Sequence, residues 1–216
     1  MNSIHIIVYG ITGLFCGFMI PYVSNKIISS KMKQKKTEIK YNFLESGLFR
    51  FVICILNGVA WAFAGMQLDP IVALLFSILF SLAVLFSIID IRIHIIPNQL
   101  VLITFAVGAL FQFIHFGGKS LLIAAICSLV MMVLFTIVGF IVGLNKVGAG
   151  DVKLAGVMGM VLGYPLILVA VFSMSLALIA YCVIGISINK LTLVSMFPFA
   201  PFMMLGMVIA LGSSIL

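Results

Sequence analysis

Two carboxylates in this chain stand beside long apolar runs, where ionised side chains are rare. Asp90 ends the run SILFSLAVLFSIID, and Asp151 closes the glycine-bracketed turn GAGD between two further apolar stretches. A carboxylate inside a membrane costs roughly 2.5–3.5 kcal/mol on insertion scales, so it usually marks a functional site. Two such groups that meet can share one proton, so that one acts as a base on water and the other as an acid on a carbonyl. Asp90 and Asp151 are therefore candidates for an aspartyl pair that hydrolyses a peptide bond.

The other three acidic residues fit different roles. Glu38 and Glu45 belong to a lysine-rich segment, and Asp69 precedes Pro70, where we expect it to begin a helix. By elimination, a pair can only be Asp90 with Asp151. The alternative is that both aspartates are polar helix-end residues favoured by the membrane surface.

The neighbours of the two aspartates are typical of a polar site at a helix end. Gly148 and Gly150 let the backbone before the second aspartate adopt conformations barred to other residues, and they let a substrate chain come close. Arg92 and Lys153 either lower the pKa of the aspartates or extend to lipid phosphates. We interpret His94 as a passive polar residue, because an aspartyl mechanism needs no third group.

The composition requires a membrane around these groups. Hydrophobic residues make up 64% of the chain and charged residues 8%, which would leave a soluble domain of this size without a polar surface. The apolar runs are long and do not alternate, which predicts an all-α, polytopic transmembrane bundle and not a barrel. At about 20 apolar residues per crossing, we expect spans over roughly 4–24, 48–66, 71–89, 98–116, 119–143, 166–187 and 196–215. A shorter apolar element, 152–163, is either an eighth span or re-entrant.

The basic residues favour eight spans with both termini outside. Seven of the twelve Lys and Arg residues lie between Lys26 and Arg50, and cytoplasmic loops carry such an excess. If 152–163 is a crossing, eleven basic residues fall on the inside and only Lys119 falls outside. This distribution also explains the net charge of +7 without a nucleic-acid partner.

The four cysteines give no sign of a metal site. Cys16, Cys54, Cys127 and Cys182 are isolated in apolar segments, without a CxxC pair. This is typical of small buried hydrophobic residues, so we expect neither metal ligands nor disulfides.

Three stretches of the chain carry a family resemblance. Residues 90–98 read DIRIHIIPN, residues 148–154 read GAGDVKL, and residues 197–202 read FPFAPF. In order and spacing they are similar to the motifs D-x-R-x-x-x-I-P-N/D, GxGD-x-K-L and P-F-[GA]-P-F of the type IV prepilin leader peptidases. This family of GxGD intramembrane aspartyl proteases includes the enzymes that process competence pseudopilins in Gram-positive bacteria. The resemblance runs from about Gly47 to the C-terminus.

The resemblance implies a membrane-embedded endopeptidase with Asp90 and Asp151 as its catalytic pair. Its substrates would be prepilin-like (pseudopilin) precursors, whose short basic leader is removed after a small residue at the cytoplasmic face of the bacterial inner membrane. Residues 1–50 would form a first transmembrane helix with a short Lys-rich loop, and residues 51–216 the transmembrane aspartyl peptidase domain. The supporting motif positions are Gly148, Gly150, Lys153, Arg92, Pro97 and Asn98.

The N-terminal part departs from the family. Many members also N-methylate the new amino terminus with S-adenosylmethionine, and their first cytoplasmic loop carries two zinc-binding CxxC pairs. Residues 10–18 (GITGLFCGF) are weakly similar to the start of such enzymes, but the loop that follows contains no cysteine. We therefore expect no zinc, and methylation with S-adenosylmethionine stays open.

Other functions would need other residues. The chain contains neither the HExxH motif of a metalloprotease nor the GxSxG motif of a serine hydrolase. The alternative of another class is a non-catalytic membrane subunit or proton-coupled transporter, with Asp90 and Asp151 as an ion site near the membrane midplane. The predicted position of both aspartates at span ends favours the protease.

Overall fold

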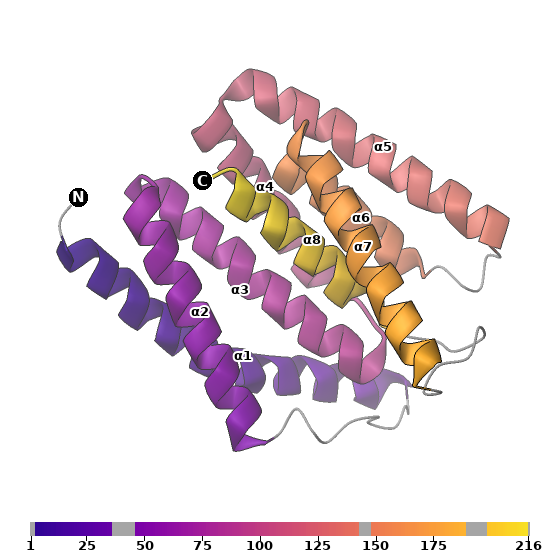
Figure 1. The fold of residues 1–216 in the computed structure, drawn as a ribbon, viewed down its shortest axis with the longest axis horizontal. Coiled ribbons are helices and arrows are strands. Elements are labelled where there is room, and N and C mark those ends of the chain that lie inside the picture. Colours follow the sequence, from indigo (N-terminus) through magenta and orange to yellow (C-terminus); the bar gives the residue numbers. More distant parts are fainter. Residues whose placement is uncertain (1–2, 36–45, 143–147, 189–197, 216) are drawn as a thin grey trace.

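The predicted all-α architecture is confirmed. The computed structural model describes residues 3–35, 46–142, 148–188 and 198–215, and every regular element in these ranges is an α-helix (Figure 1). The eight helices are α1 (Ser3–Lys35), α2 (Gly47–Gln67), α3 (Pro70–Ile93), α4 (Asn98–Phe116), α5 (Gly118–Val142), α6 (Ala149–Leu162), α7 (Leu166–Ser187) and α8 (Ala200–Ser213).

Six of these helices are long and apolar enough to cross a membrane, namely α1 to α5 and α7. Their outward side chains are apolar; Phe51, Ile141 and Phe172 are 65%, 79% and 70% exposed. Such a surface is stable in lipid and not in water, and the chain is a multi-pass membrane protein. Helices α6 and α8 have 14 residues each, or about 21 Å, which is shorter than a hydrocarbon core of about 30 Å.

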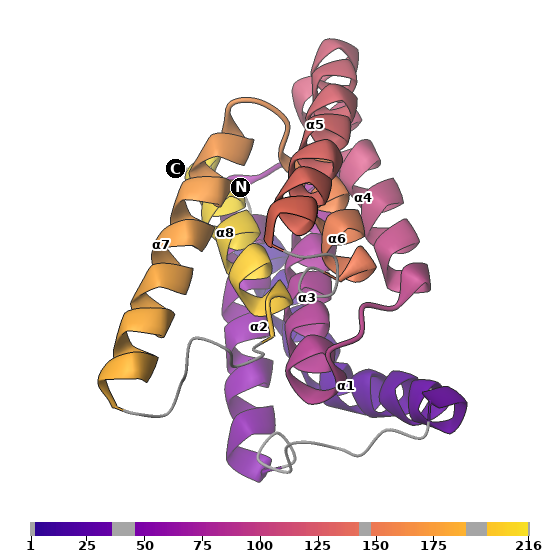
Figure 2. The same ribbon diagram turned by 90° about the vertical axis from the view of Figure 1, so that its right-hand side faces the viewer.

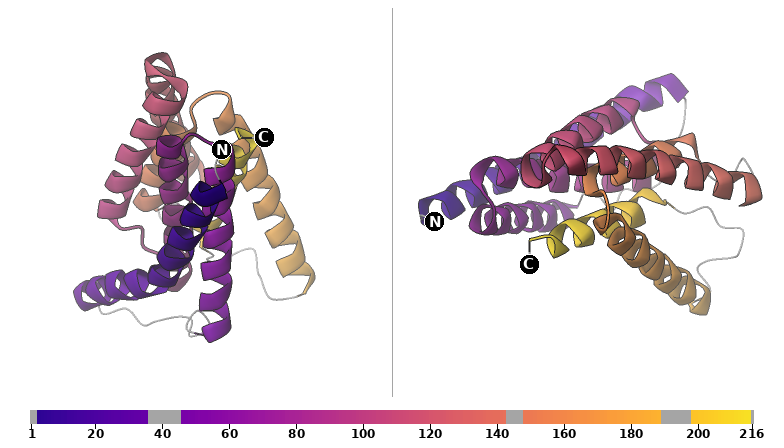
Figure 3. Two further views of the ribbon diagram at one scale, coloured as in Figure 1. Left: turned by 90° about the vertical axis from the view of Figure 1, so that its left-hand side faces the viewer. Right: turned by 90° about the horizontal axis from the view of Figure 1, so that it is seen from above.

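The first helix differs most from its predicted extent. We expected it to end near residue 24, but α1 continues to Lys35, so Lys26 and Lys31 are helical and not in a loop. The helix bends along its length and then crosses one end of the bundle (Figures 1 and 3). Pro21 lies inside α1, and an internal proline bends a helix because it removes a hydrogen bond.

Some sequence-based expectations fall outside the described residues. They concern the Lys-rich segment beyond Lys35, two further basic residues assigned to inside loops, and the first residue of the third motif. These positions are 36–45, Lys146, Lys190 and Phe197.

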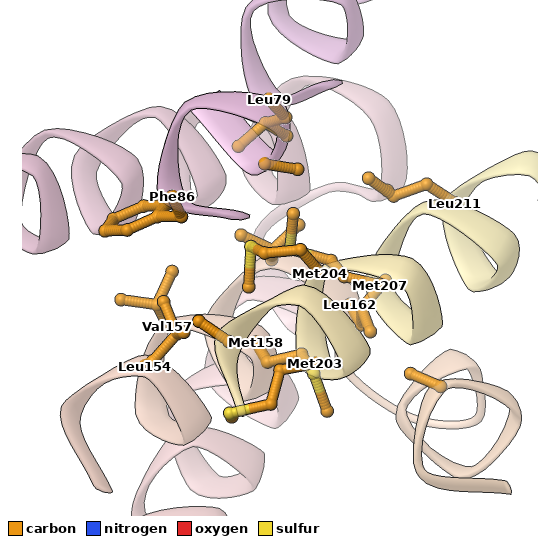
Figure 4. Close-up of a cluster of buried hydrophobic side chains, with 14 of the residues drawn as sticks. Leu79, Phe86, Leu154, Val157, Met158, Leu162, Met203, Met204, Met207 and Leu211 are labelled. Carbon is orange, nitrogen blue, oxygen red and sulfur yellow. The ribbon is translucent and has the colours of Figure 1, made fainter. Parts of the chain in front are cut away.

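The core lies where α3, α6 and α8 meet. Figure 4 shows leucine, valine, phenylalanine and methionine side chains from these three helices packed together, among them Phe86, Met158 and Met204. Helix α6 is enclosed almost completely, because all nine residues from 154 to 162 are buried. This explains why its hydrophobic pattern has no polar face: a helix covered on all sides needs none.

Glycines allow α5 to pack closely on α6. A Cβ atom at Gly159 would lie 2.6 Å from the Cα of Ser128 in α5, and one at Gly156 would lie 2.7 Å from Cγ of Met132. Small residues bring helix backbones together in this way in membranes, where van der Waals packing replaces the hydrophobic effect between helices.

The two aspartates lie at one end of the bundle, where α3 ends and α4, α6 and α8 begin. We call this the aspartate end. Helix α7 leans away from the other helices towards this end (Figure 2), and its only buried residues are Ile167, Ala170, Met174 and Gly185. The aspartates are therefore held by the termini of α3, α6 and α8 and not by α7.

Candidate active site

Asp90 lies in the last turn of α3 and is only 5% exposed. Its Oδ2 atom accepts a hydrogen bond of 2.9 Å from the backbone N–H of Ala200, the first residue of α8. The first N–H groups of a helix have no partner within the helix and carry partial positive charge. The N-terminus of α8 therefore stabilises the ionised form of Asp90 and fixes its direction.

Asp151 is the third residue of α6 and is half-buried. Its Oδ2 atom accepts a hydrogen bond of 3.2 Å from the backbone N–H of Gly148, the residue that caps α6. This is the reciprocal half of a capping box. Asp151 is thus a helix-end residue, as one of the two interpretations expected. This capping role uses only its Oδ2 atom and does not involve Oδ1.

The negative charge of Asp90 acts on Asp151. Burial, followed by the negative charge of Asp90, raises the pKa of Asp151 from 3.8 to about 6. The hydrogen bond from Gly148 and the positive charge of His94 oppose this shift without cancelling it. Repulsion by a second carboxylate in a desolvated place raises the pKa of a carboxyl group, because it disfavours the ionised form.

The segment that contains both aspartates also matches a known protein family. Residues 77–183 match the type IV leader peptidase family. The chain carries a type IV leader peptidase domain. The match begins within α3 and ends within α7, so it leaves out the α1–α2 hairpin and α8. No curated protein and no solved structure gives a significant match. With its apolar spans, the protein is a membrane protease of this family.

Gly148 and Gly150 of the peptidase domain do not act as expected through unusual backbone conformation. Gly148 has φ −71° and ψ 142°, which any residue can adopt, and Gly150 lies inside α6 without a positive φ. Gly150 does allow a close approach, but of the protein itself and not of a substrate chain: a Cβ atom there would lie 3.0 Å from Cβ of Ile96. Gly150 thus brings the start of α6 against the segment between α3 and α4.

Lys153 and Asn98 of the peptidase domain join α6 to α4. The Nζ atom of Lys153 donates a 2.9 Å hydrogen bond to Oδ1 of Asn98, the first residue of α4, and the buried Pro97 caps that helix. Both polar residues also line a cavity of about 400 Å³ between α4, α5 and α6. Helical residues that are two positions apart point about 200° apart. Because Lys153 lines the cavity and Asp151 is two positions before it, the cavity lies on the side of α6 away from Asp151.

Arg92 points into the peptidase and not to the lipid surface. It is 3% exposed, and its Nη1 atom donates a hydrogen bond to Oδ1 of Asn25 in α1. The charged side chains that shift the pKa of Asp151 are Asp90 and His94. Of the two roles considered for Arg92, contact with lipid phosphates is therefore wrong, and its action on Asp151 finds no support.

Two groups at the aspartate end could not be recognised from the sequence as neighbours of the aspartates. His94 was interpreted as passive, yet it ends α3 in the left-handed conformation (φ 49°) and its charge acts on Asp151. The backbone N–H of Ala200 has no signature of its own in the sequence. The third motif indicated a helix start at this point, but only the fold shows which carboxylate it faces.

Asp69 confirms the expectation that it precedes a helix. It is the N-cap residue of α3, followed by Pro70, and its side chain makes no capping hydrogen bond. Within the described ranges, no three His, Cys, Asp or Glu side chains are grouped so as to hold a metal ion.

Proposed function

We propose that this protein is a leader peptidase for prepilin-like (pseudopilin) precursors, with Asp90 and Asp151 as its catalytic pair. The observation that carries the proposal is the position of both aspartates at one end of the bundle, inside the segment that matches the family, where the charge of Asp90 acts on Asp151. Three hydrogen bonds and one close contact join the ends of α3, α4, α6 and α8 to their neighbours there, which supports a fixed position for the two carboxylates.

In the proposed reaction, Asp90 is the base and Asp151 the acid. A water molecule between them gives one proton to Asp90 as its oxygen attacks the scissile carbonyl, while Asp151 gives its proton to the carbonyl oxygen. The tetrahedral diol then collapses, the amine leaves with the proton taken up by Asp90, and Asp151 regains a proton from the diol. No covalent intermediate forms, and no metal ion or cofactor takes part in these steps.

The assignment of roles follows from the two environments. Asp90 accepts a hydrogen bond from the positive end of α8, and such a bond favours the ionised carboxylate. Burial and the charge of Asp90 raise the pKa of Asp151 to about 6, so this group can hold a proton in mildly acidic solution. A coupled pair titrates as a unit, and the assignment describes the resting form in which the pair holds one proton.

We further propose that the aspartate end faces the cytoplasm of a bacterial cell, in the inner membrane. Lys26 and Lys31 lie in the part of α1 that crosses this end, and Arg50 lies in the first turn of α2. Lys119 begins α5 at the opposite end. Since cytoplasmic sides carry the excess of basic residues, this orientation keeps the basic leader of a precursor in water while its hydrophobic helix stays among the spans.

The test is mass spectrometry of the N-terminus of a candidate pseudopilin after incubation with the purified protein. The proposal predicts loss of the leader with the native protein and an intact precursor with Asp90→Asn. The same experiment with and without S-adenosylmethionine reports whether a methyl group is added to the new N-terminus. An intact precursor with the native protein, together with proton uptake into vesicles, would instead support the transporter alternative.

A further inference from the structure

The contact between Arg92 and Asn25 joins the peptidase domain to a helix outside the family match. Arg92 is two residues after Asp90, in the last turn of α3, and is 3% exposed. A buried guanidinium is costly unless it has polar partners. One such partner is Oδ1 of Asn25, which accepts a hydrogen bond from Nη1 of Arg92. Asn25 lies in α1, far before residue 77 where the match begins.

One face of α1 around Asn25 is packed against the protein. The neighbouring Ser24 is 1% exposed, and Ile28, one turn further, is 2% exposed. The bend in α1 directs this part across the aspartate end (Figure 3). The hydrogen bond therefore lies inside an interhelical contact, where a long arginine side chain is held in one place.

Asp90 and Arg92 hold the end of α3 from two sides. Because helical residues two apart point about 200° apart, Asp90 reaches α8 on one side while Arg92 reaches α1 on the other. Helix α3 ends two residues after Arg92, at His94, whose backbone N–H donates a hydrogen bond to the carbonyl of Asp90. Terminal turns are the least stable part of a helix, and this one carries a carboxylate that must meet Asp151.

We propose that Asn25 is a positioning residue for Asp90, acting through Arg92. The proposal rests on the proposed function, because it concerns the same carboxylate pair. Without the Asn25 amide, the last turn of α3 loses this hydrogen bond to α1, and we expect Asp90 to move relative to Asp151. Misplacement of a catalytic group by about 1 Å can cost about 10²-fold in rate, so a small shift is sufficient.

Asn57 provides a matched control for a purely structural role. It is also a buried asparagine that ties the hairpin to the protein, since its Nδ2 donates to the carbonyl of Gly13 and its Oδ1 accepts from Ser81 in α3. Ser81 is nine residues before Asp90, or about 14 Å along the helix. Loss of Asn57 therefore weakens the attachment of the hairpin without releasing the end of α3.

The first experiment compares Asn25→Ala, Asn25→Asp and Asn57→Ala for precursor cleavage and thermal unfolding. We expect Asn25→Ala to lower kcat about tenfold with KM within about twofold, which corresponds to about 1.4 kcal/mol at the transition state. Asn25→Asp keeps an acceptor for Arg92 and should restore most of kcat. Asn57→Ala should lower the unfolding temperature and leave kcat of the folded protein unchanged. An equal loss of kcat in Asn25→Ala and Asn57→Ala, or a full kcat in Asn25→Ala, overturns the proposal.

The second experiment needs no proteolysis. In a variant with the four native cysteines replaced, an Asp90→Cys/Asp151→Cys pair is oxidised, and the rate of disulfide formation is measured with Asn25 and with Asn25→Ala. We expect the disulfide to form several-fold more slowly with Asn25→Ala. An unchanged rate, or no disulfide with Asn25 intact, overturns the positioning role. If Asn25→Ala slows disulfide formation but the native protein cleaves no precursor, the proposed function is refuted and the positioning role stands.

Discussion

The α3–α6–α8 core and the α1–α2 hairpin are held together by different forces. In the core, apolar side chains fill the space between the helices, and nine consecutive residues of α6 are buried. The hairpin exposes much of its surface to lipid and meets α3 through polar groups: Ser81 accepts a 3.0 Å hydrogen bond from Nε1 of Trp61 and donates one of 2.9 Å to Oδ1 of Asn57. The core therefore depends mainly on volume, whereas the hairpin adds hydrogen bonds to buried apolar residues such as Ile53 and Ala64.

This difference predicts which substitutions each region tolerates. A close-packed interior cannot accept an added methyl group beside a neighbouring backbone. A membrane interface held by hydrogen bonds loses only the small net value of each bond, because lipid-exposed helices find other partners. Since Asp90 and Asp151 lie at the termini of core helices, we expect precursor cleavage to respond most strongly to changes of the aspartates. The hairpin should matter only where it touches α3 near Asp90.

The largest effect is expected from the aspartates themselves. Asp90→Asn or Asp151→Asn should abolish cleavage, with a loss of at least about 10²–10⁴-fold in kcat, because each removes an acid or base from the reaction. Expression and membrane insertion should be unaffected. Asp69→Asn is the matched control, since Asp69 caps α3 at the opposite end without a side-chain hydrogen bond. The measurement is precursor cleavage; substantial activity in either catalytic variant rejects the mechanism.

The next effect is a pH dependence of cleavage. Asp151 must carry a proton to act as the acid, and burial together with Asp90 raises its pKa to about 6. We expect kcat/KM to fall about tenfold per pH unit above this value, because kcat/KM reports the free enzyme. A profile that is flat between pH 5 and pH 8, in a range where the protein stays folded, would contradict the assignment of Asp151.

The same shift has a consequence for stability. A carboxyl whose pKa is raised on folding favours the folded state only when protonated. The native protein should therefore lose stability as the pH rises from about 3.8 to about 6, and Asp151→Asn should show a smaller loss. Thermal unfolding in detergent across that range distinguishes the two proteins.

The fold and the pair of aspartates could be predicted because both rest on local signals. Long apolar runs require helices in a membrane, and most helix limits agree with the expected ones; 98–116 and 166–187 are identical to α4 and α7. Asp90 and Asp151 stood out because a charge is rare in such a chain. Their role in catalysis remains a prediction for the experiments above.

The partners of these residues could not be predicted, because they depend on helix packing. Arg92 faces Asn25 across 67 positions, and Asp90 faces the N–H of Ala200 across 110. The same sequence pattern allows a side chain at a helix end to turn outward to lipid or inward to a neighbouring helix. Arg92 turns inward because α1 crosses this end of the bundle and offers Asn25 as a partner. The length of α1 was missed for a related reason: polar, lysine-rich sequence does not prevent a helix once its first part is in place.

Packing volume in the core gives the third effect. Gly159→Ala would place a Cβ atom 2.6 Å from the backbone of Ser128 in α5, and overpacking of this kind costs about 1–3 kcal/mol. Gly212→Ala is the matched control in α8, because a Cβ atom there meets nothing within 4 Å and alanine favours a helix by up to about 1 kcal/mol. Thermal unfolding should show the first variant destabilised and the second not; equal behaviour would mean that α5 and α6 can move apart at no cost.

The smallest effect is expected where the hairpin meets α3. Ser81→Ala removes the hydroxyl that bonds both Trp61 and Asn57, and we expect a loss of about 0.6 kcal/mol, a typical value for a polar contact between membrane helices. Ser87→Ala is the control on the same helix, because that hydroxyl donates to the carbonyl of Ala83 within α3. If Ser81→Ala lowers the unfolding temperature more than Gly159→Ala does, hydrogen bonds hold the hairpin more firmly than packing holds the core, and the contrast between the two regions is reversed.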